Sequence, residues 1–327
     1  MKLNWRRLIE GILFSFVPLF SFVFFVYGSQ LYLSSDDSEG MFLGSISNTA
    51  LTENYGTGQN IETTPTTADN QSGEELNNEE PVSTEINAKA AISVETDLQN
   101  NENIIFKRDE DLKLPIASLT KLMTAIISFE NYDLSQNITV SKEADLQLPM
   151  QTDFKLGDTF SIEKFLYVML IESSNKAAYT LSENIGQEKF VALMNKKAQR
   201  IGLKNTFFAD PTGLSAQNVS TASDLVILAK YILKNHPEIA QITTIKNYEL
   251  RDLGKIANTN QLLTDVPDIV FSKTGFTNYA NGCLLIAIDN SKNNDYLINI
   301  ILGADDRLLE MKKLINWQSI SDNNSKQ

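Results

Sequence analysis

The stretch SLTKLMTAIISFE, residues 118–130, decides the fold of this 327-residue chain. It is apolar on nearly all sides when drawn as a helix, so we predict a helix buried in the middle of a domain. Positions i and i+3 share one face of a helix, so the Lys121 amine can reach the Ser118 hydroxyl. The spacing therefore predicts a serine nucleophile activated by a lysine base.

Further strands and helices are predicted on both sides of this helix. Two strands, at 89–96 and 103–107, precede it. Helices follow at 161–172, with Ser161 as N-cap, and near 174–185, 187–201 and 221–234. Three strands at 268–275, 282–290 and 295–303 come before a final helix at 304–318. We expect an α/β fold in which N- and C-terminal strands pair in an antiparallel sheet, with a helical block against it.

Two further motifs accompany Ser118 and Lys121. Ser173-Ser174-Asn175 lies between two predicted helices, and Lys273-Thr274-Gly275 ends a predicted strand. Each motif alone is common, as a helix-helix turn or a strand end. Together, in this order and in these settings, they match the S-x-x-K, S-x-N and K-T-G set of active-site serine penicillin-recognising enzymes.

The predicted setting favours a neutral Lys121. Burial, the positive end of the helix dipole and a second cation at Lys273 all disfavour the ammonium form, which predicts a lowered pKa for Lys121. The backbone N–H groups of Ser118 and Phe276 are predicted to form an oxyanion hole. We expect Gly275 to let the substrate backbone lie against the strand without a Cβ in the way.

The chain resembles the D-alanyl-D-alanine carboxypeptidase family of low-molecular-mass penicillin-binding proteins. Beyond the three motifs, the resemblance covers essentially all of 88–318 and is carried by LPIASLTKLMTA, IGLKNTFFADPTGLS, STASDLVILAKYIL, NTNQLL, KTGFTNYANGC and ILGADDR. It implies a β-lactamase/transpeptidase-like fold and an enzyme that needs no metal or cofactor. The implied reaction is acylation of the serine by the penultimate D-Ala of a peptidoglycan stem peptide, release of the last D-Ala, and hydrolysis.

The resemblance also implies roles for individual residues. Ser118 is the nucleophile and Lys121 its base, while Ser173 and Asn175 serve as proton relay and substrate-amide contact. The terminal carboxylate of the substrate is bound by residues of the third motif, namely Lys273 and Thr274. β-Lactams would acylate the same serine, because they present a strained amide and a carboxylate in the same geometry.

Other functions on the same fold stay open. The chain could act as a D,D-endopeptidase that cuts cross-links, as a β-lactamase, or as a non-catalytic sensor of cell-wall peptide or β-lactam. Class A β-lactamases add an E-x-x-L-N motif, and none follows Ser173, which counts against that activity. A sensor derived from an enzyme would be expected to lose Ser118 or Lys121, and both are present.

Some residues depart from the family pattern or have two interpretations. Family members more often have glycine where this chain has Ser174 and Asn281. Some members have an arginine after the last strand that holds the carboxylate, but for Arg307 the preferred interpretation is a surface ion pair with Asp305 or Asp306. Cys283 is expected to be a buried apolar residue and His236 a helix-terminal one.

Charge and hydropathy divide the N-terminal part. Residues 11–35 carry no charge, which predicts a transmembrane signal-anchor at 11–33, with a cleaved signal peptide as the alternative. Basic residues before it place 1–10 in the cytoplasm and the rest outside, with the membrane as a partner. The acidic segment 34–87 is predicted to be a disordered linker, which leaves 88–327 as the catalytic domain.

The composition excludes several function classes. A formal net charge of −13 argues against a nucleic-acid partner, which needs clustered Lys and Arg. One His and one Cys exclude an internal disulfide and any His- or Cys-rich metal site.

Overall fold

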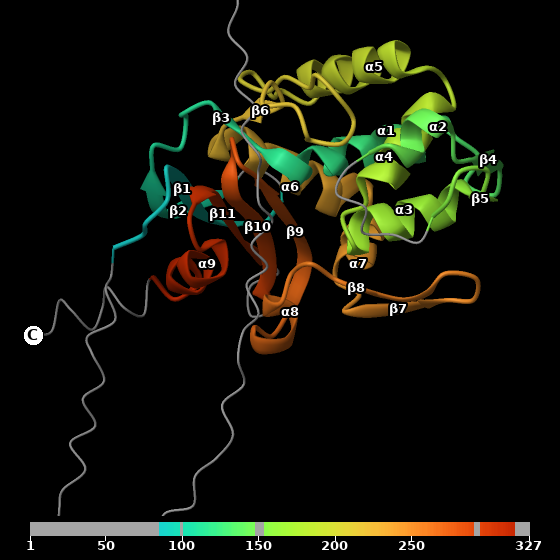
Figure 1. The fold of residues 1–327 in the computed structure, drawn as a ribbon. Helices are drawn as coiled ribbons and strands as arrows, with labels where there is room; N and C mark the ends of the chain where they lie inside the picture. The colour runs from blue at the N-terminus through green and yellow to red at the C-terminus, as the bar shows by residue number, and fades with distance from the viewer. Residues whose placement is uncertain (1–84, 99–100, 148–153, 291–294, 318–327) are drawn as a thin grey trace, which may run out of the picture. The chain divides into compact units, whose positions relative to one another are not determined.

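The computed structural model describes residues 85–98, 101–147, 154–290 and 295–317. These residues include a five-stranded sheet, which lies beside a block of helices (Figure 1). The strand order is β2-β1-β11-β10-β9, and all neighbours are antiparallel. The strands are β1 (Ala90–Thr96), β2 (Glu102–Arg108), β9 (Ile269–Thr277), β10 (Asn281–Asn290) and β11 (Asp295–Ala304). The predicted pairing of N- and C-terminal strands is confirmed.

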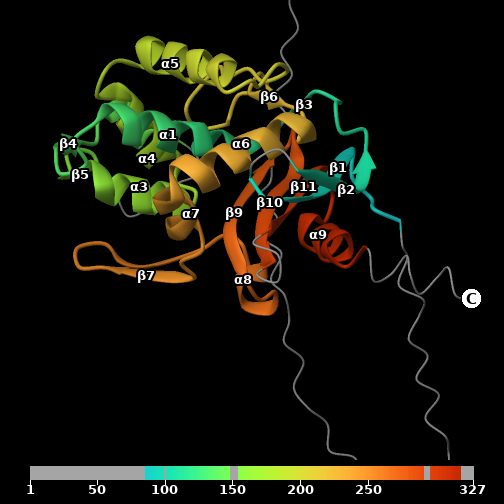
Figure 2. The ribbon, with the colours of Figure 1, turned by 180° about the vertical axis from the view of Figure 1, so that it is seen from behind.

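The sheet is buried on both faces, because successive side chains of a strand point to opposite sides. On β11, Ile298, Ile300 and Leu302 belong to the core shared with the helical block. Ile301, between them, packs in a second core with Met311 of the C-terminal helix α9 (Arg307–Ile315). Figures 1 and 2 show α9 on the sheet away from the helical block.

The helical block contains the helices that the sequence predicts, with ends shifted by a few residues. They are α1 (Lys121–Asn131), α3 (Ile162–Ile171), α4 (Asn175–Glu183), α5 (Gln187–Arg200) and α6 (Ala222–Asn235). The predicted N-cap at Ser161 is confirmed, since its side chain accepts a hydrogen bond from the Lys164 N–H. Every residue of α1 from Lys121 to Ser128 is buried, as predicted for the central helix.

Several short elements were not predicted, because they are too short for a periodic pattern. They comprise the paired strands β3 (Leu114–Pro115) with β6 (Val219–Ser220), β4 (Asn137–Thr139) with β5 (Thr159–Ser161), and β7 (Asn247–Leu250) with β8 (Gly254–Ala257), and the helices α2 (Lys142–Asp145), α7 (Pro237–Thr243) and α8 (Leu262–Asp265).

The local setting of two motifs differs from the prediction. Ser118 does not begin an α-helix but lies in the short 3₁₀ helix η1 (Ala117–Thr120), and α1 begins at Lys121. The Lys273-Thr274-Gly275 motif does not end its strand. Instead β9 continues to Thr277, because residues 276–277 still pair with residues 281–282 of β10.

The domain begins earlier than the sequence predicts. Ile86 is buried, and the Asn87 N–H donates to Glu310 of α9. Residues 86 and 87, which were predicted to belong to the linker 34–87, therefore pack as part of the domain, and residues 34–84 of that predicted linker lie outside the described residues. The transmembrane span predicted for 11–33 lies outside the described residues, and within them no helix is long and apolar enough to cross a bilayer.

Candidate active site

All three motifs meet in one cleft. It is a pocket of about 120 Å³ at the meeting point of η1, the turn between α3 and α4, and β9. The residues that line it are Ser118, Ser173, Asn175, Leu214, Thr259, Thr274, Gly275, Phe276, Thr277 and Arg307. Residues about a hundred positions apart in the chain are thus brought to one place, as the resemblance implies.

Gly275 brings β9 into contact with the nucleophile turn. A Cβ built on Gly275 would lie 3.0 Å from the Ile116 carbonyl oxygen and 3.1 Å from the Ser118 nitrogen. The prediction assigned this free space to a substrate backbone, but the structure fills it with the chain that carries Ser118. Glycine is therefore needed here so that β9 and η1 can approach each other closely.

Two non-glycine residues in the serine motifs have left-handed backbone conformations. Ala117, directly before the nucleophile, has φ 47°, and Ser173 has φ 66°. Such conformations cost on the order of 1–3 kcal/mol each and persist where the surrounding structure holds them. Ala117 directly precedes Ser118, and Ser173 itself lines the cleft. The fold therefore fixes the direction of the hydroxyl groups of Ser118 and Ser173.

Lys121 is fully buried, and three oxygens surround its amine. The Nζ lies 2.9 Å from Ser118 Oγ, 2.6 Å from Asn175 Oδ1 and 2.5 Å from the Thr212 carbonyl oxygen. The last two atoms can only accept hydrogen bonds. A neutral amine would give them its two hydrogens and direct its lone pair at the hydroxyl of Ser118. This is the arrangement in which lysine takes a proton from serine.

The electrostatics of the cleft favour that neutral amine. Desolvation holds the pKa of Lys121 well below its usual value, the positive charge of Lys273 lowers it further, and Asp210 acts in the opposite direction. The pKa lowering expected from the sequence is therefore confirmed in direction and in two of its causes, burial and Lys273.

Lys273 is the second buried amine of the site. Its Nζ donates to Ser173 Oγ at 2.9 Å and to the Thr274 carbonyl oxygen at 3.1 Å. Burial and the positive charge of Arg307 lower its pKa to about 7. Ser173 is thereby linked to a group that changes charge near neutral pH.

The preferred interpretation of Arg307 as a surface ion-pair residue is wrong. The side chain lines the cleft, and its Nη1 donates to the Gly275 carbonyl oxygen at 3.4 Å. Its Nε is buried and has no hydrogen-bond partner among the described residues. Space for the side chain comes from Gly282, where a Cβ would lie 2.9 Å from Arg307 Cβ. The sequence did not determine whether Arg307 would reach the cleft. In the structure α9 begins at Arg307, and this position brings its side chain to the cleft.

The structure adds cleft residues that sequence reasoning did not single out. Thr259 and Thr274 share a hydrogen bond between their hydroxyl oxygens at 2.6 Å, and Leu214 lines the opposite part of the pocket. Thr212 contributes only its carbonyl to Lys121. Thr212 and Leu214 lie within IGLKNTFFADPTGLS and Thr259 within NTNQLL, two of the stretches that carry the family resemblance, whereas Thr274 was already predicted.

The remaining predicted residues are found as follows. Phe276 follows Gly275 on β9, with its side chain 58% exposed at the cleft. Cys283 is fully buried on β10 opposite Gly275, and burial raises the pKa of its thiol to about 11, so the apolar role is confirmed. His236 caps the end of α6 and contacts Glu130 at 3.2 Å, which confirms a structural role away from the cleft.

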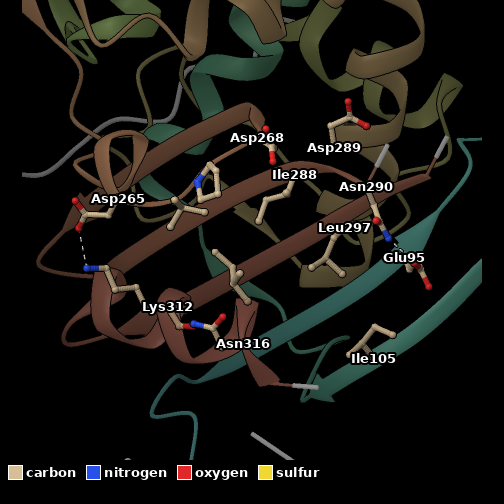
Figure 3. Close-up of a pocket in the computed structure, with 13 residues that line it drawn as sticks. Glu95, Ile105, Asp265, Asp268, Ile288, Asp289, Asn290, Leu297, Lys312 and Asn316 are labelled. Atoms are coloured by element: carbon tan, nitrogen blue, oxygen red, sulfur yellow. Dashed lines mark hydrogen bonds and ion pairs between the residues drawn. The ribbon is translucent and has the colours of Figure 1, made fainter. Parts of the chain in front are cut away.

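A larger cavity, of about 460 Å³, lies at the far end of the sheet (Figure 3). Its wall includes Ile288 and Leu297, while Glu95, Asp265 and Asp289 stand around it. None of the described residues that line it is a serine, cysteine or histidine. The smaller cleft is therefore the site with nucleophilic chemistry.

Comparisons with known proteins agree with this site. Residues 75–306 match the family described as D-alanyl-D-alanine carboxypeptidase. A D-alanyl-D-alanine endopeptidase of Pseudomonas aeruginosa is 36% identical over 200 residues, which cover 58% of this chain and 64% of the relative. The carboxypeptidase DacF of Bacillus subtilis is 31% identical over 70% of this chain and 61% of its own. The chain thus matches less than two thirds of the length of these two relatives.

Solved structures share the fold. A D-alanyl-D-alanine carboxypeptidase from Mycobacterium tuberculosis aligns with a TM-score of 0.65 and 26% identity, over 72% of this chain and 92% of that one. Penicillin-binding protein D2 from Listeria monocytogenes in an ampicillin-bound form aligns with a TM-score of 0.63 and 26% identity, over 71% and 96% of the two chains.

Replacing Lys121 with alanine should keep the fold and slow acylation of Ser118 by at least about 10²-fold, the lower range for loss of a general base. The rate of acylation by an activated ester would be followed by intact-protein mass spectrometry. Lys197→Ala is the matched control, because it removes another buried lysine, which pairs with Glu130. Near-normal acylation of the Lys121 variant would contradict the lysine-base mechanism.

Proposed function

Because this chain belongs to the D-alanyl-D-alanine carboxypeptidase family, we propose that it is a serine peptidase that removes the terminal D-Ala from peptidoglycan stem peptides. The observation that carries the proposal is the buried Lys121 amine, 2.9 Å from Ser118 Oγ and held by two further acceptors. This geometry supplies an activated serine without histidine or metal.

Acylation begins with attack of Ser118 Oγ on the carbonyl carbon of the penultimate D-Ala. The hydroxyl proton passes to Lys121 Nζ, and the N–H groups of Ser118 and Phe276 stabilise the oxyanion; loss of one such donor typically costs about 2.7–4 kcal/mol. When the C–N bond breaks, the leaving amine takes the hydroxyl proton of Ser173, which Lys273 contacts, and the proton that Lys121 received from Ser118 replaces it on Ser173. Water then attacks the ester carbonyl, one of its protons returns to Ser118 Oγ, and the shortened peptide leaves with the new carboxyl group.

Three groups are placed to bind the terminal carboxylate of the substrate. Lys273 and Thr274 lie on β9 beside the nucleophile, and Arg307 approaches the same strand from α9. The buried Nε of Arg307, unpaired among the described residues, is a donor that a ligand carboxylate would satisfy. A cationic pocket of this kind favours peptides with a free carboxylate next to the scissile bond.

The composition of the cleft argues against efficient β-lactam hydrolysis. None of the ten described residues that line it is a carboxylate, so the pocket offers no Glu of the type that activates the deacylating water in class A β-lactamases. Penicillin is therefore expected to acylate Ser118 and to be released more slowly than from a class A β-lactamase, because the cleft offers no carboxylate that would speed hydrolysis of the ester.

D,D-endopeptidase activity is the second candidate function. It is favoured by relatives named D-alanyl-D-alanine endopeptidase in three organisms, among them Haemophilus influenzae, where the relative is 36% identical over 197 residues. The same nucleophile and base would cut a D-Ala peptide bond within a cross-link. The two activities differ only in what must fit beyond the scissile bond.

The full chain and its Ser118→Ala variant should differ in covalent labelling. After exposure to benzylpenicillin, intact-protein mass spectrometry should find one adduct on the wild type and none on the variant. A pentapeptide ending in D-Ala-D-Ala should lose one D-Ala only with the wild type, and a cross-linked peptide dimer tests the endopeptidase. If penicillin labels Ser118 but neither peptide is cut, the sensor function replaces the enzymatic one. A folded wild type that reacts with none of the three would refute the proposal.

Removal of the Arg307 charge should move the alkaline side of the pH profile. Burial, with a further contribution from the positive charge of Arg307, lowers the pKa of Lys273 to about 7, so Arg307→Gln removes part of that lowering and keeps Lys273 protonated to higher pH. In kcat/KM against pH, the descending limb should move to higher pH while the maximum falls, because one carboxylate contact is lost. Arg307→Lys, which keeps a charge, should leave the limb nearer its original position. An unmoved limb in Arg307→Gln would contradict carboxylate binding by a protonated Lys273.

We also propose that residues 11–33 anchor the protein in the cell membrane, with residues 1–10 in the cytoplasm and the catalytic domain outside. Support comes from the uncharged run 11–35, long enough as a helix to span about 30 Å of hydrocarbon, and from basic residues before it. An extracytoplasmic catalytic domain would face peptidoglycan, which agrees with the proposed substrate.

Alkaline extraction of membranes tests the anchor. The full chain should stay in the membrane pellet, and protease added to intact spheroplasts should degrade the catalytic domain. Phe22→Lys together with Phe24→Lys should release the chain, because a charge at the bilayer centre costs about 2.5–3.5 kcal/mol per residue on insertion scales. Recovery of a shortened wild-type chain in the soluble fraction would instead favour a cleaved signal peptide.

A further inference from the structure

Asp210 organises the loop that lies over Lys121. Its Oδ1 accepts hydrogen bonds from Thr212 N at 2.6 Å, Thr212 Oγ1 at 2.7 Å and Gly213 N at 2.7 Å. Its Oδ2 accepts from Ser215 N at 2.8 Å and Asn218 Nδ2 at 2.7 Å. One carboxylate thus satisfies five donors of a single loop. Burial raises its pKa, but the hydrogen bonds together outweigh burial and hold the pKa below its usual value, so Asp210 is ionised at neutral pH.

The same loop, residues 210–218, packs closely against the turn that contains Ser118. Gly213 has φ 88°, and a Cβ there would lie 2.1 Å from the Ala117 carbonyl oxygen, so only glycine fits. Thr124 Oγ1 of α1 donates to the Pro211 carbonyl at 2.6 Å, and Ile116 N donates to the Asn218 carbonyl at 3.0 Å. The loop therefore has little freedom to move relative to Ser118.

From this geometry we propose that Asp210 is a positioning residue for the proposed acylation, which holds the Thr212 carbonyl at 2.5 Å from Lys121 Nζ and so directs the lone pair of the amine at Ser118. The inference rests on the proposed function. Among the described residues, Asp210 makes no hydrogen bond to Lys121 and does not line the cleft. It acts through the Thr212 carbonyl, which makes it a positioning residue rather than a catalytic one.

A carboxylate is needed because both oxygens face donors. An asparagine at 210 would place its NH₂ group against N–H donors, so one side of the turn would lose its bonds and the Thr212 carbonyl would shift. The charge matters in a second way. The charged groups that act on Lys121 are Lys273, which lowers its pKa, and Asp210, which raises it. Removal of the Asp210 charge therefore lowers the pKa of Lys121.

Asp210→Asn in the full chain should give two separable effects. The plateau rate of Ser118 acylation by benzylpenicillin should fall about 10–10²-fold, the size of effect expected when a reacting group is misplaced by about 1 Å. The acid limb of the pH profile, which follows deprotonation of Lys121, should move to lower pH. If Asp210 served only the stability of the fold, the variant would give less folded protein, and the acid limb of its pH profile would stay at the wild-type pH.

Asp224→Asn is the matched control. Asp224 is also a buried carboxylate that binds a loop, through Asn205 N and Thr206 Oγ1, both at 2.7 Å, but it lies on α6 away from the cleft. Asp224→Asn should keep the wild-type plateau rate of acylation and the wild-type position of the acid limb of the pH profile. If Asp210→Asn behaves like Asp224→Asn in an active enzyme, the positioning role is overturned. If the wild type itself is not acylated, the proposed function fails instead.

Thr212→Val tests position without changing charge. It removes the hydroxyl that donates to Asp210 and keeps the carbonyl and the carboxylate. The plateau rate should fall, by less than in Asp210→Asn, and the acid limb should stay in place. This variant also decides the matter if Asp210→Asn does not fold, because an unchanged plateau in folded Thr212→Val would contradict the role of the turn.

Discussion

The rest of the structure depends on the Lys121 amine, which is fully buried and out of contact with solvent. Desolvation of a cation costs several kcal/mol even after the protein relaxes, so a fully buried Lys121 is tolerated only if it is neutral or well paired. Its partners are two acceptors and one hydroxyl, and no carboxylate in the described part of the chain is in hydrogen-bond contact with it. Lys121 Nζ thus belongs both to the buried core around α1 and to the catalytic cleft. The burial that stabilises the domain also lowers the pKa of Lys121, so that its amine can act as a base.

The fold explains how such distant motifs meet. Strand β9 is an edge strand of the sheet, η1 packs on its face at Gly275, and residues 274–277 of the strand line the cleft. Helices α3 and α4 end and begin at the second serine motif, where the left-handed backbone at Ser173 directs a hydroxyl toward Lys273. The sheet therefore positions the third motif, and the helical block positions the other two.

Much of this arrangement could be predicted from side-chain patterns. The strands, the long helices, the buried α1 and the Ser118–Lys121 contact follow from hydrophobic periodicity and from i, i+3 spacing. What could not be predicted depends on tertiary packing. The 3₁₀ turn that contains Ala117 packs closely against Gly275 of β9 and against Gly213. The Thr212 contact with Lys121 uses a backbone carbonyl, which no residue type signals. Arg307 reaches the cleft because α9 begins at this residue, with only two residues between it and the end of β11 at Ala304.

The two buried lysines must differ in charge for the site to work. Both lose hydration and both have a cation nearby, but the pKa of Lys121 is held well below its usual value, whereas that of Lys273 is lowered to about 7 beside the carboxylate site proposed at Arg307. A bound carboxylate would raise the pKa of Lys273 and hold it protonated, and the resulting ion pair would add no net charge beside Lys121. Burial, the largest cause of the lowered pKa of Lys121, would therefore keep its amine neutral while Lys273 carries the charge that binds the substrate.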